Sequence, residues 1–452
     1  MKRLRQYQTI LKKEPKLFEV SEKLYKEAMQ NEGQYNCVQA EITAYVIAPI
    51  IYRFVAWVLQ DAIKRGKKRL YFLARDGYSM YHAAKILCDK VSLPIECRYL
   101  YCSRYALRSA QFYMLSEKSL DYVCLGGMDV TFEKLMKRAG LSSAEAVKVA
   151  HLLGYESRMD DAMSYTAIKE MKPRLGECSF FMERMYERSR ECYPKVKGYL
   201  EQEGLLDEIP FAIVDSGWTG SMQKSLQQLM QSMGSDNILE GYYFGMYEYP
   251  KDVKKETYHC YYFEPETSIR RKVYFNNNLF ECIFSSPEGM ATGYKKENHM
   301  FVPTFEHSGN PNKERIEYST DVIKRYTEEI VKRYPQDINE DKNKFLNMAE
   351  KLLFYFMGKP TVEEATEYGN YIFCDDVIGE ENQIVATRLN SREIKDNFLV
   401  SKSMNMLMKT GKPIKESPGI EGRTVLNSEM GEKKLSQCAL CKYALYIRKR
   451  MK

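Results

Sequence analysis

Histidine is scarce in this sequence, and its placement argues against a metal centre built on imidazole ligands. The 452 residues include only five histidines, His82, His151, His259, His299 and His307. They are scattered, and no two stand at a spacing that would bring both onto one metal ion.

Paired cysteines are also nearly absent. Of the twelve cysteines, only Cys438 and Cys441 form a C-x-x-C pair, and no second pair completes the roughly four ligands of a zinc site. The N-terminal MKRLRQYQTILKK is charged and lacks the long apolar stretch of a secretory signal. We therefore expect free thiols and a cytoplasmic protein.

Long apolar runs and strong charge bias are missing as well. The most apolar stretch, Ala44 to Leu59, is shorter than the roughly 20 residues of a membrane span and is interrupted by Pro49 and Arg53. We expect it to be a buried helix. The net charge of +7 from 68 basic and 61 acidic residues is a weak surplus, and no basic tract with interleaved aromatics indicates nucleic-acid binding.

Three common nucleotide and hydrolase signatures do not occur. The sequence has no GxxxxGK[ST], no GxGxxG after an apolar strand and no GxSxG. These absences exclude a P-loop, a dinucleotide-binding fingerprint and a nucleophile elbow.

Short apolar runs alternating with helical spacing indicate an α/β protein. Five runs have the length of buried strands: Leu70–Ala74, Cys97–Cys102, Phe211–Val214, Gly241–Met246 and Tyr258–Phe263. Helical patterns separate most of them, which predicts a mainly parallel, doubly wound sheet. We expect a helical segment over 1–37, an α/β domain over 38–301 with a helical insertion at about 112–203, and a mostly helical region over 302–452 that ends in a basic tail.

A polar, glycine-bearing loop is expected directly after one of these strands. In Asp215–Ser221 the glycines permit tight turns, the hydroxyls supply donors, and a helix begins immediately afterwards. This pattern suits an anion such as a phosphate monoester, and Asp215 can hold Mg²⁺ or sugar hydroxyls. An ordinary capped helix start explains the same pattern, and both interpretations remain open.

A second group of polar residues ends the strands at Leu70–Ala74 and Cys97–Cys102. Arg75, Asp76 and Gly77 follow the first strand, and Ser103 and Arg104 follow the next. In a parallel sheet these positions meet at one edge, where ligands bind. The charged residues can equally form an internal salt bridge or a solvated helix face.

Three segments in order resemble a bacterial protein family. They are YFLARDGYSMYHAAKIL, YLYCSRYALR and AIVDSGWTGSMQKSLQQL, and the likeness spans about Val38 to Tyr294. These "FLARDG" modules occur in polysaccharide-assembly clusters, are similar to phosphoribosyltransferases and are often fused to haloacid-dehalogenase (HAD) phosphatases. The resemblance implies a transferase that moves ribosyl 5-phosphate from phosphoribosyl pyrophosphate (PRPP) onto a glycan, in a route to ribofuranose. A separate phosphatase then removes the phosphate.

The resemblance also implies roles for individual residues. Asp215 and Asp76 would bind Mg²⁺ or act in catalysis, while Arg75, Arg104 and Lys68 would hold pyrophosphate. The remaining predicted substrate contacts are Gly77, Ser103, Ser216, Gly217, Trp218, Thr219, Gly220 and Ser221. Ser216 stands where the family usually has a second acid, and the loop is about one residue shorter than common.

Two other functions remain as alternatives. A HAD hydrolase needs an aspartate nucleophile in a D-x-D pattern, but Ala74 stands in the nucleophile position before Asp76. A non-catalytic scaffold of a glycan-assembly complex is the other alternative. The basic end, from Lys442, can contact an anionic membrane beside a lipid-linked acceptor or can simply face water.

Overall fold

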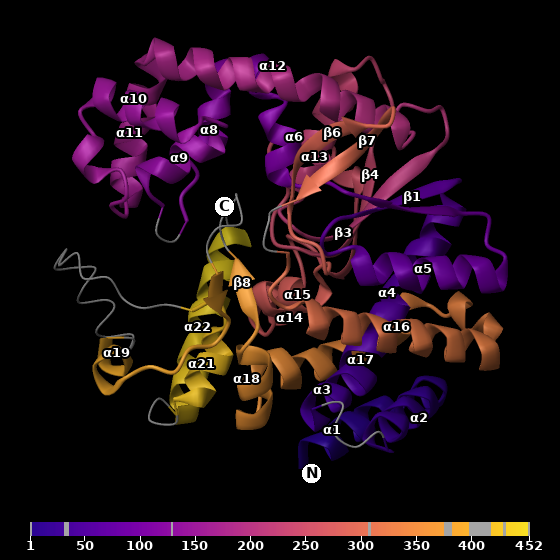
Figure 1. Cartoon of the computed structure of the whole chain (residues 1–452). Coiled ribbons are helices and arrows are strands. Elements are labelled where there is room, and N and C mark those ends of the chain that lie inside the picture. Colours follow the sequence, from indigo (N-terminus) through magenta and orange to yellow (C-terminus); the bar gives the residue numbers. More distant parts are fainter. Residues whose placement is uncertain are drawn as a thin grey trace.

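A parallel five-stranded sheet forms the centre of the molecule (Figure 1). The computed structural model describes residues 2–30, 36–127, 130–305, 309–374, 382–396, 417–427 and 431–450. The strands are β1 (Arg69–Leu73), β2 (Glu96–Leu100), β3 (Phe211–Trp218), β4 (Glu240–Met246) and β5 (Tyr258–Phe263). Their order is β2-β1-β3-β4-β5, with every neighbouring pair parallel. The expected α/β class and the five expected strands are confirmed.

Both faces of the sheet are covered, as a doubly wound fold requires. Successive residues of β1 alternate between two hydrophobic cores, with Leu70 and Phe72 in one and Tyr71 and Leu73 in the other. On the first face lie α4 (Ala48–Lys64), α5 (Tyr78–Val91), α15 (Asn277–Phe284) and α16 (Lys313–Arg333). On the second lie α6 (Arg104–Ser109), α12 (Ser179–Gln202) and α13 (Ser221–Ser232).

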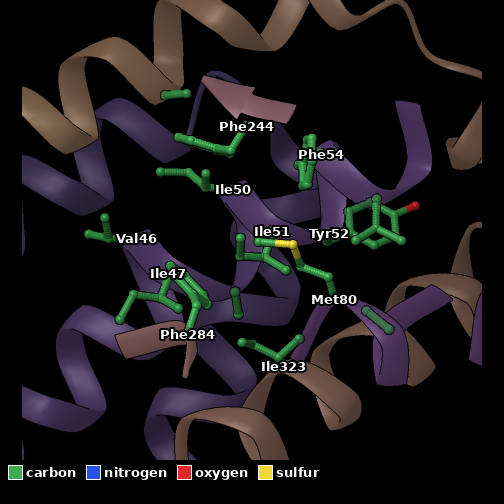
Figure 2. Close-up of a cluster of buried hydrophobic side chains, with 14 of the residues drawn as sticks. Val46, Ile47, Ile50, Ile51, Tyr52, Phe54, Met80, Phe244, Phe284 and Ile323 are labelled. Carbon is green, nitrogen blue, oxygen red and sulfur yellow. The ribbon is translucent and has the colours of Figure 1, made fainter. Parts of the chain in front are cut away.

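The apolar stretch expected to be buried is a core helix. It runs through α3 (Cys37–Ile42), a π-helical turn η1 (Thr43–Ile47) and α4. This is the one helix in the described residues long and apolar enough to cross a membrane, and 94% of its most apolar window is buried. Figure 2 shows Ile51 and Phe54 of this helix beside Met80 of α5, Phe244 of β4 and Ile323 of α16.

The expected insertion packs around a hydrophobic core of its own, made of residues between Phe112 and Met185. Its elements are α7 (Phe112–Leu115), η2 (Ser116–Ser119), α8 (Leu120–Val123), α9 (Phe132–Arg138), α10 (Ser143–Leu153), η3 (Glu156–Arg158), α11 (Tyr165–Glu177) and the first part of α12. These helices stand apart from the sheet in Figure 1, and α12 connects them to it.

The boundaries expected at residues 37 and 301 do not separate hydrophobic cores. Tyr7 of α1 (Lys2–Leu11) and Leu24 of α2 (Pro15–Gln30) belong to the same core as the first face of the sheet. So do residues of α16 and of α17 (Lys342–Leu353). Residue 301 itself lies inside β7 (Met300–Phe305), which pairs with β6 (Ala291–Glu297) in an antiparallel hairpin that the sequence patterns did not predict.

The chain beyond α17 continues as several short elements and one long helix, α22. They are η6 (Phe354–Gly358), α18 (Val362–Gly369), β8 (Ile372–Cys374), β9 (Asn382–Ile384), α19 (Ser391–Asp396), α21 (Ile420–Leu426) and α22 (Gly431–Arg450). The remaining short helices are η4 (Lys255–Thr257), α14 (Ile269–Val273) and η5 (Pro335–Asn339). Figure 1 shows α21 and α22 side by side, and α22 also contacts α14.

Candidate active site at the strand switch point

The predicted polar residues meet where the strand order reverses. From β1 the chain passes to β2 on one side and later to β3 on the other, so the crevice outside the carboxyl ends of β1 and β3 is the switch point of the sheet. Ligands of doubly wound sheets bind in such crevices. Asp76 follows β1 and Asp215 lies near the end of β3, so the fold brings both carboxylates to this edge.

The loop expected over Asp215–Ser221 is mostly strand. β3 continues to Trp218, with Gly217 opposite Gly245 and Trp218 opposite Met246. Gly217 has a φ of 115°, and a Cβ there would lie 2.3 Å from the carbonyl oxygen of Gly245. This glycine therefore allows β3 and β4 to approach closely, and the connection to α13 shrinks to Thr219 and Gly220.

Two long helices begin at this edge with glycine caps. Gly77 precedes the 14-residue α5 and Gly220 precedes the 12-residue α13. No side chain of the described residues caps either helix, which favours an anion at these helix starts, although the first amide of α5, that of Tyr78, already donates to the Arg75 carbonyl over 3.1 Å. Each glycine also has a packing role. A Cβ at Gly77 would lie 2.6 Å from the Leu73 carbonyl oxygen, and one at Gly220 would lie 2.6 Å from the Tyr258 ring.

Ser216 connects the two aspartates. Its hydroxyl donates to Oδ2 of Asp76, and its backbone N–H donates to Oδ1 of Asp215 over 2.9 Å. Burial raises the pKa of Asp76, whereas the Ser216 hydroxyl and two arginines oppose that shift. Burial also raises the pKa of Asp215 well above its usual range, and the charge of Asp76 adds to the effect. The site thus confines two carboxylates that disfavour each other's ionisation.

A third carboxylate, Glu281 on α15, belongs to this group and was not predicted. Burial, and next the charge of Asp76, raise its pKa to about 7, while Arg104, Arg75 and the Trp218 side chain act in the opposite direction. One signal in the sequence marked it, because Glu281 is the single acid within the apolar run LFECIF. Its distance along the chain from the other acids hid its role.

The two predicted arginines lie with the carboxylates. The charge of Arg104 lowers the pKa of Asp76, Asp215 and Glu281, and that of Arg75 lowers the pKa of Asp76 and Glu281. Arg104 is exposed at the first turn of α6, and Arg75 is partly exposed after β1. Both cations are therefore placed to meet an anionic ligand at the switch point.

The other predicted contacts divide between ligand-facing and structural positions. Thr219 is exposed and Ser221 is partly exposed at the start of α13. Trp218 packs among aromatic rings, with Phe275 at 5.3 Å and Phe280 at 5.6 Å between ring centroids. Ser103 instead caps α6. Its oxygen accepts from Ala106 N–H over 2.9 Å and its O–H donates to the Ala291 carbonyl over 2.6 Å. These two bonds give Ser103 a structural role as the cap of α6.

Lys68 was expected near the pyrophosphate, and that expectation is wrong. It precedes β1, and its backbone N–H donates to the Pro210 carbonyl over 2.8 Å before β3 begins. Lys68 thus lies at the amino end of the sheet, opposite to Asp76.

The donor set at the switch point suits a hard cation that shares a phosphorylated ligand. The described residues contain no group of three or more His, Cys, Asp or Glu side chains arranged to hold a metal. Cys438 and Cys441 are among these residues and form no part of such a group. Asp76 and Asp215 form a pair, however, and Mg²⁺ commonly binds one or two carboxylates together with substrate phosphates. The raised pKa values of both aspartates fit a site in which a cation would relieve their repulsion.

Comparison with known proteins does not extend this description. No model of a known protein family matches the chain, and no curated protein is significantly similar to it in sequence.

Proposed function

We propose that this chain is a phosphoribosyltransferase-type glycosyltransferase that takes ribosyl 5-phosphate from PRPP. The observation that carries the proposal is the meeting of Asp76 and Asp215 with Arg75 and Arg104 at the switch point, beside two helices without side-chain caps. A ligand with phosphate groups at two ends and sugar hydroxyls between them matches this distribution of cations, amides and carboxylates. The resemblance of the three segments to "FLARDG" modules implies PRPP as such a ligand.

The two phosphate ends are assigned by position. The start of α13, with Thr219, Gly220 and Ser221, receives the 5-phosphate because backbone amides and hydroxyls meet there. Arg75 and Arg104 hold the pyrophosphate, whose negative charge grows as it leaves. Gly217 and Trp218, the last residues of β3, are partly exposed and directly precede Thr219.

Asp76 and Asp215 would hold Mg²⁺ beside the bound donor. The cation would supply charge neutralisation for the leaving pyrophosphate. Ser216 orients both carboxylates, through its hydroxyl on one side and its backbone N–H on the other. This serine occupies the position of the missing second acid, so the chain uses one hydrogen-bonding residue where an additional carboxylate is usual.

The reaction exchanges one bond at C1 of the ribose. The C1–O bond to pyrophosphate breaks, a bond from C1 to an acceptor hydroxyl oxygen forms, and the hydroxyl proton leaves. We assign that proton to Glu281, because a carboxylate with a pKa of about 7 is a suitable general base near neutral pH. The protein otherwise acts by positioning the reactants and by stabilising charge as it develops.

The acceptor and cellular setting follow the resemblance. We propose a glycan acceptor, assembled on a lipid carrier at the cytoplasmic face during surface polysaccharide synthesis, and a separate phosphatase that acts on the product. The basic end of α22 is suited to such a location. On this helix Tyr446 stacks on Tyr247, while Leu440, Leu445 and Ile447 are 68%, 51% and 48% exposed.

A transfer assay tests the proposed activity. The purified chain is incubated with PRPP, Mg²⁺ and a fraction of lipid-linked glycans, and pyrophosphate release and labelled ribose 5-phosphate on the lipid fraction are measured. The proposal expects both products in equal amounts. Phosphate release from ribose 5-phosphate alone would support the hydrolase alternative, and binding of glycan with no turnover would support the scaffold.

A further inference from the structure

A strip of aromatic rings leads away from the switch point along the outer strand of the sheet. We define the aromatic strip as Tyr78, Tyr81, Tyr99, Tyr101 and Phe305, all of them partly exposed. Their centroids follow one another at 5.7 Å from Tyr78 to Tyr99, 4.9 Å from Tyr99 to Tyr101 and 5.4 Å from Tyr101 to Phe305. Tyr81 joins at 5.8 Å from Tyr99. The strip is therefore continuous and reaches from α5 across β2 to the end of β7.

Two members of the strip stand next to site residues in the sequence. Tyr78 directly follows Gly77, the cap of α5, and Tyr101 stands two residues before Ser103, the cap of α6. Since Arg75 and Arg104 flank the same two caps, the strip adjoins the proposed pyrophosphate position. A molecule lying on the strip can thus reach the reacting carbon without crossing another element of the sheet.

Two buried polar atoms, one in the strip and one beside it, lack hydrogen-bond partners. In the part of the chain that the structure describes, neither the hydroxyl of Tyr99 nor Oε2 of Glu288 has a partner, although both atoms are buried. Ser286 lies beside the Tyr99 hydroxyl, but it donates to the Glu288 carbonyl over 3.1 Å and makes no well-formed bond with the phenol. Buried polar atoms nearly always have a hydrogen-bond partner. A ligand or water is therefore expected to bond to the Tyr99 hydroxyl and to Oε2 of Glu288.

Glu288 lies close to three tyrosines of the strip, Tyr78, Tyr99 and Tyr101. Burial is the first cause of the raised pKa of Tyr78 and of Tyr101, and the charge of Glu288 is the second. It also adds to the raised pKa of Tyr99. A carboxylate acceptor and a phenol donor thus lie among aromatic rings.

We propose that the aromatic strip and Glu288 bind the sugar ring of the acceptor. A pyranose offers an apolar face of C–H groups and a rim of hydroxyls, and the strip offers ring surfaces with one donor and one acceptor. An anionic group is poorly suited, because Glu288 would repel it. As an acceptor site the strip rests on the proposed function, but its ability to bind a sugar can be measured separately.

Saturation-transfer difference NMR tests this assignment. The probes are methyl β-D-glucopyranoside, methyl β-D-galactopyranoside and methyl N-acetyl-β-D-glucosaminide, each at millimolar concentration with the full chain. We expect ring-proton signals from at least one of them, and a loss of most of that signal in the double variant Tyr99→Phe/Glu288→Gln. The matched control Tyr113→Phe/Glu117→Gln, in the helical insertion, keeps the signal. Thermal unfolding of each variant confirms that it is folded.

PRPP titrations on the same samples separate the two proposals. The strip variant should bind PRPP with Mg²⁺ as the native chain does. If PRPP binds but no probe gives a signal, or the signal survives the strip variant, the sugar assignment is overturned while the donor site stands. If the probe signal is lost in the strip variant as expected, but the native chain does not bind PRPP, the strip binds sugar. Its acceptor role is then overturned together with the transferase.

Discussion

The Ser216 hydroxyl donates a hydrogen bond to the Asp76 carboxylate and so ties β3 to the loop that follows β1. The same residue donates its backbone N–H to Asp215. Ser216 is 2% exposed, so its two hydrogen bonds are shielded from competing water. One small residue therefore sets the distance and orientation of the two acids on which the proposed donor site depends.

Replacing Ser216 with alanine should weaken Mg²⁺-dependent PRPP binding while the fold is kept. A hydrogen bond to a charged group contributes about 1.5–3 kcal/mol, so we expect a loss of roughly tenfold or more in affinity. Because the Ser216 hydroxyl lowers the pKa of Asp76, its removal raises that pKa further. The pH below which PRPP binding fails should move upward. Calorimetric titrations across pH measure both effects, and Ser232→Ala at the end of α13 is the control. Unchanged affinity and pH limit would remove Ser216 from the site.

Glu281→Gln should stabilise the ligand-free protein at alkaline pH and abolish transfer. The folded pKa of Glu281 is about 7, above its usual value of 4.5, so folding takes up a proton between these values. Its ionisation therefore costs stability progressively as pH rises from about 4.5 to 7, and the full cost remains above that. We expect the free energy of unfolding of Glu281→Gln to exceed that of the native chain by on the order of 1–3 kcal/mol at pH 8 and by almost nothing at pH 4.

Urea unfolding of both proteins at these two pH values measures the difference. A gain of the same size at both pH values would show that the charge of Glu281 is not responsible. A variant that keeps full transfer activity would exclude Glu281 as the base.

Two glycines with positive φ should differ sharply in their tolerance of alanine. Gly217 and Gly234 have φ values of 115° and 91°, but a Cβ at Gly217 meets the Gly245 carbonyl whereas one at Gly234 has open space within 4 Å. Gly234→Ala should cost about 1–2 kcal/mol from the backbone alone. Gly217→Ala should cost several kcal/mol, because β3 and β4 must separate. Equal costs in urea unfolding would contradict the close strand pairing.

The basic end of α22 should favour anionic membranes. Arg448 and Arg450 are exposed, and each basic residue near such a surface contributes about 1 kcal/mol. The double variant Arg448→Gln/Arg450→Gln should reduce co-sedimentation with anionic vesicles at low salt by more than tenfold. Lys118→Gln/Lys169→Gln, which removes the same charge from the helical insertion, should not. Equal sedimentation of both variants would mean that the tail only faces water.

The sheet could be predicted from sequence because its signal is local. A run such as Leu70–Leu73 is apolar at every position, which is typical of a strand covered on both faces, and Asp76 and Gly77 mark its end. The switch-point site followed from the same patterns, since strand ends of a parallel sheet share one edge.

What could not be predicted depends on contacts between distant segments. The residues around Gly217 are typical of a turn. Gly217 belongs to a strand only because it pairs with Gly245 on β4. Glu281 joins the acids through the packing of α15, about 65 residues after Asp215. The β6–β7 hairpin is held by Tyr294, whose hydroxyl donates to the Tyr101 carbonyl over 2.8 Å, and this pairing leaves no trace in local spacing.

The most direct test of the donor site is a calorimetric titration of the native chain and Asp215→Asn with PRPP, with Mg²⁺ and then with a chelator. The native chain should bind PRPP only when Mg²⁺ is present. Asp215→Asn should lose at least tenfold in affinity, yet unfold at a higher temperature without ligand, because the repulsion from Asp76 is gone. Asp236→Asn, an exposed control, should match the native chain in both measurements. Failure of the native chain to bind PRPP with Mg²⁺, or equal binding by Asp215→Asn, would contradict the account.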